Sequence, residues 1–179
     1  MVNKMTKWNF LEPFLFTNEQ LHLLDISRKL NENHTTVRKY LNEFAKEGLL
    51  KIRLKGRLTL YEINKNFPLI IDYLSIAEKE FLIKKSNENN IFKELIKDIQ
   101  QISKKPVIIF GSGVNNFSKA KDIDIVCLED LKSLKNKYNK EFHIININSF
   151  KTINQTLKNE IKKKHIIVYG VEEVVKWLI

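Results

Sequence analysis

Residues 107–130, VIIFGSGVNNFSKAKDIDIVCLED, place one apolar run before Gly-Ser-Gly and a second around Asp122 and Asp124. A strand points successive side chains to opposite faces, so the two carboxylates share one face, about 7 Å apart, while Ile123 and Ile125 share the other. A charge among apolar strand neighbours is costly unless it is paired or binds a metal. The stretch therefore predicts two strands, with a cation site on the second.

The turn between these strands suits a phosphate group. Gly111 and Ser112 follow the first strand and offer backbone N–H groups and a hydroxyl without bulky side chains. Mg²⁺ takes oxygen ligands and is usually held by one or two carboxylates together with substrate phosphates. Asp122 and Asp124 are therefore predicted Mg²⁺ ligands. The structural alternative, a plain turn followed by edge charges, leaves Asp124 unexplained.

Short apolar runs alternate with amphipathic ones on both sides of this stretch. The pattern predicts an α+β chain whose second half is a small mixed-sheet domain. The predicted strands are 107–110, 123–128, 142–147 and 166–169, and the predicted helices are 91–103, 130–138, 153–163 and 171–178.

The order of an apolar strand, Gly111-Ser112, nine residues and Asp122-x-Asp124 resembles the signature of the DNA polymerase beta superfamily of nucleotidyltransferases. It is most similar to the minimal nucleotidyltransferase group. The resemblance implies that Gly111 and Ser112 bind the triphosphate of ATP or another NTP. It also implies that Asp122 and Asp124 are catalytic through Mg²⁺ and that AMP is transferred to a protein or small-molecule acceptor. Some such domains are antitoxins that modify a HEPN-type toxin, which is the implied protein partner here.

One departure from that family concerns the third acid, which active members carry on a later strand. The segment EFHIININ (141–148) has Glu141 only at its start, and its interior polar residues are His143, Asn146 and Asn148. Glu141 or a distant acid substitutes, a partner supplies the group, or the domain binds nucleotide without catalysis. His143 is a further candidate ligand, ranked below an ordinary strand residue.

The first third of the chain predicts two short helices and a hairpin. In LHLLDISRKLNENHTTVRKYLNEFAKEGLLKIRLKGRLTLYEIN (21–64), apolar residues recur first at helical spacing and then alternate around Lys-Gly-Arg. This order resembles the winged helix-turn-helix domain of prokaryotic transcription regulators, which implies binding to double-stranded DNA through the second helix and the hairpin tip. The alternative is a solvated surface. The implied DNA-binding residues are His34, Thr35, Thr36, Arg38, Lys39, Arg53, Lys55 and Arg57.

The segment between these parts predicts a long amphipathic helix. FPLIIDYLSIAEKEFLIKK (67–85) is apolar at every third or fourth residue, and it either spaces the domains or forms a homodimer, which we favour. The predicted division is 1–65 winged helix-turn-helix, 66–89 linker or dimerisation helix, and 90–179 nucleotidyltransferase domain.

Composition limits the remaining choices. The net charge of the 179 residues is +10 and favours a polyanionic partner. No apolar run approaches the roughly 20 residues of a membrane span, and MVNKMTKWNF has no secretory signal, so we expect a cytoplasmic protein without a membrane partner. The single cysteine, Cys127, is predicted to be a core residue. A competing hypothesis is a transcription regulator whose second domain only binds nucleotide or dimerises.

Overall fold

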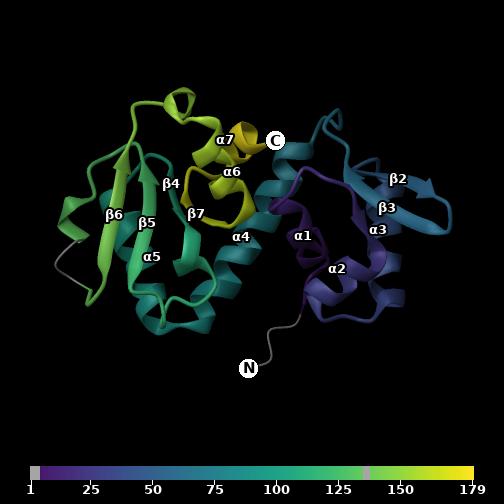
Figure 1. The fold of residues 1–179 in the computed structure, drawn as a ribbon, viewed down its shortest axis with the longest axis horizontal. Helices are drawn as coiled ribbons and strands as arrows, with labels where there is room; N and C mark the ends of the chain where they lie inside the picture. Colours follow the sequence, from purple (N-terminus) through teal and green to yellow (C-terminus); the bar gives the residue numbers. More distant parts are fainter. Residues whose placement is uncertain (1–4, 135–137) are drawn as a thin grey trace. The chain divides into compact units, whose positions relative to one another are not determined.

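The computed structural model describes residues 5–134 and 138–179, apart from the side chain of Lys132. The chain divides into two units, one that ends at Ala77 and includes Ile179, and one from Glu78 to Leu178. Both contain helices and a sheet, so the chain belongs to the α+β class (Figure 1). Among the described residues, every helix is too short or too polar to serve as a membrane span.

The first unit consists of short helices and a three-stranded sheet of order β1-β3-β2. After a 3-10 turn at Lys7–Leu11, its elements are α1 (Glu12–Leu15), β1 (Leu21–His22), α2 (Leu23–Leu30), α3 (His34–Lys46), β2 (Leu50–Lys55), β3 (Leu58–Ile63) and the start of α4 (Ile70–Glu88).

Helices α2 and α3 follow from their apolar spacing and their caps. Ile26 on α2 and Val37 on α3 are fully buried. Asn31 ends α2 with a φ of 53°, a left-handed conformation that asparagine tolerates better than most residues. Asn33 begins α3, because its side-chain oxygen accepts a hydrogen bond from the backbone N–H of Thr35 at 2.8 Å.

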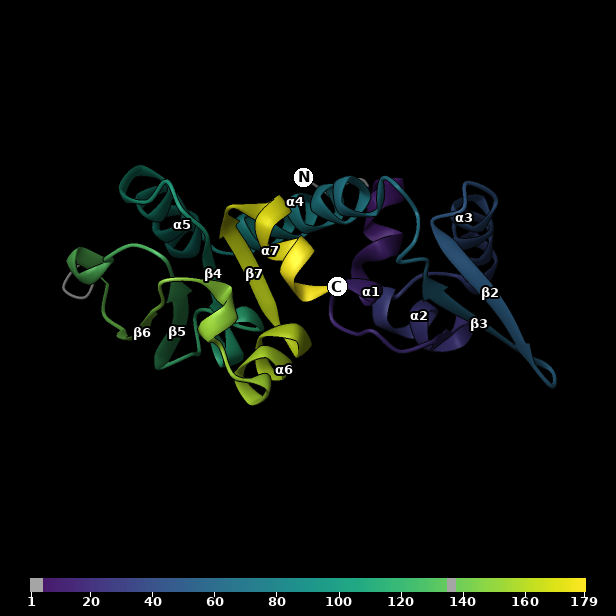
Figure 2. The same ribbon diagram turned by 90° about the horizontal axis from the view of Figure 1, so that it is seen from above.

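Strands β2 and β3 form an antiparallel hairpin. Lys55 lies opposite Leu58, and the two-residue turn between them begins at Gly56, whose φ of +61° favours glycine. Ile52 and Leu54, which alternate as a core face would, are 45% and 77% exposed. Figure 2 shows why, since the hairpin tip extends past the helices of its own unit.

The second unit contains a four-stranded sheet of order β6-β5-β4-β7. β5 and β6 are parallel, and the other two pairs are antiparallel. Besides the end of α4, its elements are α5 (Asn90–Ile102), β4 (Val107–Phe110), β5 (Asp122–Cys127), β6 (Glu141–Asn146), α6 (Gln155–Lys163), β7 (His165–Tyr169) and α7 (Val171–Leu178).

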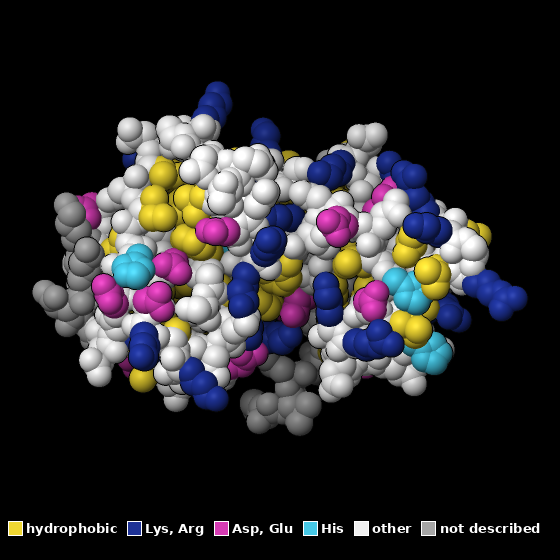
Figure 3. Space-filling view, in the orientation of Figure 1, with side chains coloured by type: hydrophobic (Ala, Val, Ile, Leu, Met, Phe, Trp, Pro, Cys, Tyr) yellow, Lys and Arg dark blue, Asp and Glu magenta, His cyan; other side chains and the backbone are white. Residues whose placement is uncertain are grey.

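The two faces of this sheet differ in chemistry. Helix α5 lies against one face (Figures 1 and 2), to which it presents an apolar side. The buried residues of that side are Phe92, Leu95, Ile96 and Ile99. On the other face, a histidine and acidic side chains gather at the surface over β5 and β6 (Figure 3). The exposed acidic side chains therefore lie on the face of the sheet opposite α5.

A buried polar pair joins α4 to β7 within the second unit. Nε2 of His165 lies 2.8 Å from Oε1 of Glu78, and both side chains are almost completely buried. Nδ1 of His165 lies 2.8 Å from the carbonyl oxygen of Ile161. Since both imidazole nitrogens have partners, burial of this histidine is compatible with a stable core.

Two predicted elements differ from the structure. The predicted helix at 130–138 is wrong over its described residues, which hold only a 3-10 turn at Lys132–Leu134; residues 135–137 lie outside the described part. That segment offers the core only Leu131 and Leu134, an apolar face one turn long. The helix predicted at 67–85 is α4, Ile70–Glu88, and only Asn89 separates it from α5, which Asn89 caps by accepting a hydrogen bond from the N–H of Phe92.

Candidate functional sites

Asp122 and Asp124 lie on the polar face of β5, as their spacing predicts. Both are partly exposed, whereas Ile123 and Ile125 are fully buried on the opposite face. In the strand register, Asp124 lies opposite Phe110 at the end of β4 and opposite His143 on β6. Asp124 therefore has a neighbouring residue on each of the two strands beside β5.

Gly111 brings the turn after β4 against this aspartate. Its φ is +74°, and a Cβ atom at this position would lie 2.6 Å from Oδ2 of Asp124. A side chain here would be strained by the backbone conformation and would collide with the carboxylate. Ser112, the next residue, is exposed. The predicted phosphate-binding turn and the predicted metal ligands thus form one site.

His143 completes a group of three potential metal ligands. Its Nδ1 lies 3.2 Å from Oδ1 of Asp124 and 3.9 Å from Oδ2 of Asp122. One ligand atom from each of the three residues falls within 4.8 Å of the others. Two carboxylates and an imidazole converging from adjacent strands have the chemistry and spacing that a divalent cation requires.

Glu141 supports His143 from the other side of the ring. Its Oε1 lies 3.3 Å from Nε2 of His143. Hydrogen bonds with Glu141 and then with Asp124 raise the pKa of His143 above its ordinary value of 6.5. Protonation therefore supplies the positive charge that this acidic site attracts when no metal is bound.

The alternatives for the third acid differ in where the structure places them. Glu141 lies next to His143 and outside the three-ligand group. Asn146 accepts a hydrogen bond from the thiol of Cys127 at 3.1 Å, and Asn148 lies beyond the end of β6. His143, which the sequence ranks below an ordinary strand residue, is the residue beside the aspartates. The parallel pairing of β5 and β6 decides this, and the pattern of a single strand does not reveal it.

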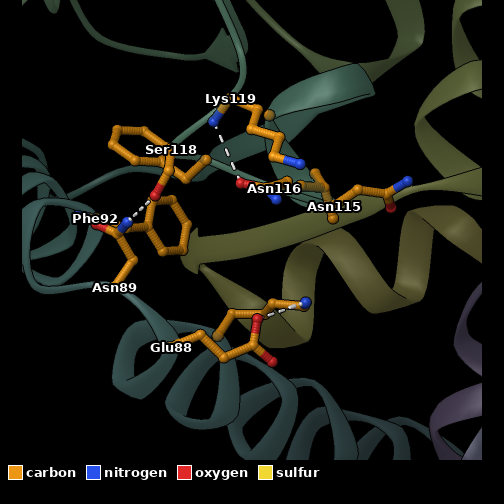
Figure 4. Close-up of a pocket in the computed structure, with 11 residues that line it drawn as sticks. Glu88, Asn89, Phe92, Asn115, Asn116, Ser118 and Lys119 are labelled. Atoms are coloured by element: carbon orange, nitrogen blue, oxygen red, sulfur yellow. Dashed lines mark hydrogen bonds and ion pairs between the residues drawn. The ribbon is translucent and has the colours of Figure 1, made fainter.

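A pocket of about 310 Å³ adjoins the same turn (Figure 4). Gly113 is one of its walls, and a Cβ atom there would lie 3.8 Å from the carbonyl oxygen of Asp122. The rest of the lining comes from the loop after Gly113 and from the ends of α4 and α5. It consists mainly of polar side chains over two phenylalanines: Lys85, Glu88, Asn89, Asn115, Asn116, Ser118 and Lys119, with Phe92 and Phe117.

The charges and amides of this pocket are partly paired. Nζ of Lys85 binds Oε2 of Glu88 at 2.8 Å. Asn89 donates a hydrogen bond to the hydroxyl of Ser118, which joins the start of α5 to the loop. Asn115 is exposed at the rim. The pocket is thus lined mostly by neutral hydrogen-bonding groups, and its size is at the lower end of small-molecule sites, about 300–1,000 Å³.

The eight residues predicted to contact DNA are all exposed. His34, Thr35, Thr36, Arg38 and Lys39 occupy the first half of α3, and Lys55 and Arg57 flank the glycine of the hairpin turn. Arg53 differs, because its Nε is bound to Oε1 of Glu62 at 2.9 Å on the neighbouring strand.

Comparison of the chain with protein-family models, curated proteins and solved structures found no match. The function is therefore inferred from the chemistry of the acidic site on β5 and β6 and of the basic surface of α3 and the hairpin.

Proposed function

We propose that the second unit transfers a nucleotidyl group, AMP from ATP, to a hydroxyl-bearing acceptor. The observation that supports this proposal is the close approach of Gly111 to Asp124, which brings the predicted phosphate-binding turn next to the predicted metal ligands. Nucleoside triphosphates are ligands of this kind, because they carry phosphate oxygens and bind together with a divalent cation.

In this reaction the protein mainly positions the reactants and stabilises charge. An acceptor hydroxyl attacks the α-phosphorus, a new P–O bond forms, the bond to the β-phosphate oxygen breaks, and pyrophosphate leaves. The proton of the hydroxyl passes to water, which reaches the partly exposed carboxylates. A bound cation supplies charge neutralisation at the phosphate oxygens. Asp122, Asp124 and His143 would hold that cation, while Gly111 and Ser112 position the phosphates.

The pocket beside Gly113 suits the nucleoside. Its amides match the hydrogen-bonding edge of a base, and its two lysines are Lys85, which is paired with Glu88, and Lys119. Gly113, two residues after Gly111, is the wall that this pocket shares with the turn.

The decisive test is transfer of label from α-³²P-ATP, with cell extract as the source of acceptor. The wild-type chain should label an acceptor in a metal-dependent way, and Asp122→Asn with Asp124→Asn should not, because the amides keep the shape of the site and remove its charge. Binding of ATP without transfer would instead support a regulator whose second unit only binds nucleotide.

We further propose that the first unit binds double-stranded DNA, which the exposure of the basic residues on α3 and at the hairpin turn supports. The logarithm of the DNA-binding constant falls linearly with the logarithm of the salt concentration, and removal of one phosphate-binding charge should reduce this slope by about 0.9. Arg38→Ala with Arg57→Ala should thus weaken binding in a mobility-shift assay and lower that slope by up to about 2, whereas the aspartate variants should bind DNA normally. Unchanged binding and slope would contradict this assignment.

DNA binding and nucleotidyl transfer together fit a homodimeric, cytoplasmic regulator of its own operon. By resemblance, the acceptor would be a HEPN-type toxin. Co-expression with such a toxin, followed by mass spectrometry for an added AMP, would test that partner directly, and an unmodified toxin would exclude it.

A further inference from the structure

The candidate ligands on β5 and β6 include a nitrogen donor, and this affects which cation the site prefers. Mg²⁺ takes oxygen ligands in near-octahedral geometry and loses water reluctantly. Imidazole suits first-row transition ions, and sites of mixed nitrogen and oxygen donors bind these ions in a regular order of increasing affinity from Mn²⁺ to Cu²⁺. His143 stands where a third carboxylate would give oxygen donors alone.

The orientation of His143 is that of a ligand. Nε2 of His143 faces Oε1 of Glu141, 3.3 Å away, so a proton on Nε2 can be donated to that carboxylate. Nδ1 faces Oδ1 of Asp124 at 3.2 Å and Oδ2 of Asp122 at 3.9 Å, and a bound cation would take the place of a proton on this nitrogen. The three possible ligand atoms lie within 4.8 Å of one another, close enough for one cation to bind all of them. Metal-binding histidines commonly have a carboxylate in the position of Glu141, which fixes the ring and increases its basicity.

We infer that this site binds first-row transition ions more tightly than Mg²⁺, with Mn²⁺ as the ion to compare because it shares the oxygen ligands of Mg²⁺, and that His143 is the residue that sets this selectivity. The inference rests on the proposed function for the use of the cation, but the preference itself belongs to the ligands and exists without nucleotide. Glu141 acts through His143 as a positioning residue. Mn²⁺ also keeps the affinity for phosphate oxygens that nucleotidyl transfer requires.

The test measures metal affinity on the full chain after treatment with a chelator. Mn²⁺ binding is followed by the electron paramagnetic resonance signal of the free ion, and Mg²⁺ by competition. The wild-type chain should bind Mn²⁺ at least about tenfold more tightly than Mg²⁺. His143→Asp should bring the two affinities within about threefold of each other, since it restores an oxygen-only set.

Two more variants separate ligation from folding. Glu141→Gln should weaken Mn²⁺ binding by about tenfold, the lower end of effects at supporting carboxylates, because this side chain is 77% exposed. Ile145→Ala, two residues further along the same face of β6, should leave the affinities unchanged. Circular dichroism checks that each variant is folded.

The outcomes distinguish this inference from the function on which it rests. Equal affinities in the wild-type chain, or an unchanged ratio in His143→Asp, would overturn the selectivity even if label transfer proceeds with Mg²⁺. A clear Mn²⁺ preference without transfer to any acceptor would support the metal assignment and refute the enzyme.

Discussion

Replacement of Gly111 by alanine tests whether the turn and the aspartate form one site. The new Cβ would lie 2.6 Å from Oδ2 of Asp124, and ordinary van der Waals separation begins near 3.4 Å, so the carboxylate must move by about 0.8 Å. The left-handed φ of +74° adds a conformational cost of about 1–2 kcal/mol for any L-residue. We expect metal affinity to fall about 10–100-fold, as it does when the orientation of a ligand is disturbed.

Two other glycines supply matched controls. Gly170 has a φ of +72°, and its Cβ would lie 2.6 Å from Cγ of Pro106, so Gly170→Ala should destabilise the same unit without moving Asp124. Gly56→Ala, with a φ of +61° and nothing within 4 Å, should show the conformational cost alone.

The assay combines Mn²⁺ titration with thermal unfolding of each variant. Only Gly111→Ala should lose metal affinity, while Gly170→Ala should lose comparable stability and keep its affinity. If Gly111→Ala binds Mn²⁺ as tightly as Gly170→Ala does, the position of the turn beside Asp124 does not affect cation binding. The turn and the aspartates would then not form one site.

Other expectations concern groups away from that turn or the pH dependence of the site. Burial raises the pKa of the Cys127 thiol to about 11, so iodoacetamide at pH 8 should label the native chain at least about 100-fold more slowly than the denatured one; comparable rates would show that the thiol is accessible. Glu78→Ala should cost about 3 kcal/mol of unfolding free energy by removing the carboxylate partner of buried His165, and Glu78→Gln, which keeps an acceptor, should cost less; equal losses in denaturant titration would contradict this. Because the folded-state pKa of His143 is raised above 6.5, its protonated form stabilises the metal-free chain fully below that pH, and this contribution is lost as the pH rises through the folded pKa. Melting of His143→Asn in chelator should therefore depend less on pH across that window than melting of the wild-type chain.

The sequence predicted the elements whose side chains follow a regular period. The alternation of Asp122 and Asp124 with buried isoleucines placed both carboxylates on one face of β5, and the helix predicted at 91–103 is α5, Asn90–Ile102. Such patterns are local, so one chain suffices to recognise them.

Features that depend on pairing between distant segments could not be predicted. His143 lies beside Asp124 because β6 is parallel to β5 in one register, and a shift by one residue would have turned the ring to the other face. The exposure of Ile52 and Leu54 depends on how far the hairpin extends past its helices. The segment after β5 has charged residues at helical spacing, yet its described residues bury only Leu131 and Leu134 and form a 3-10 turn.

β6 is an edge strand, and this gives a bound cation a role in folding. In the sheet order β6-β5-β4-β7, β5 is the only strand that pairs with β6 among the described residues. His143 is the ligand on β6, while both aspartates are on β5. A cation at 100 times its dissociation constant adds about 2.7 kcal/mol to the state in which the two strands are paired. Chelation should then accelerate amide hydrogen exchange along Glu141–Asn146 first, while β4 and β7 remain protected.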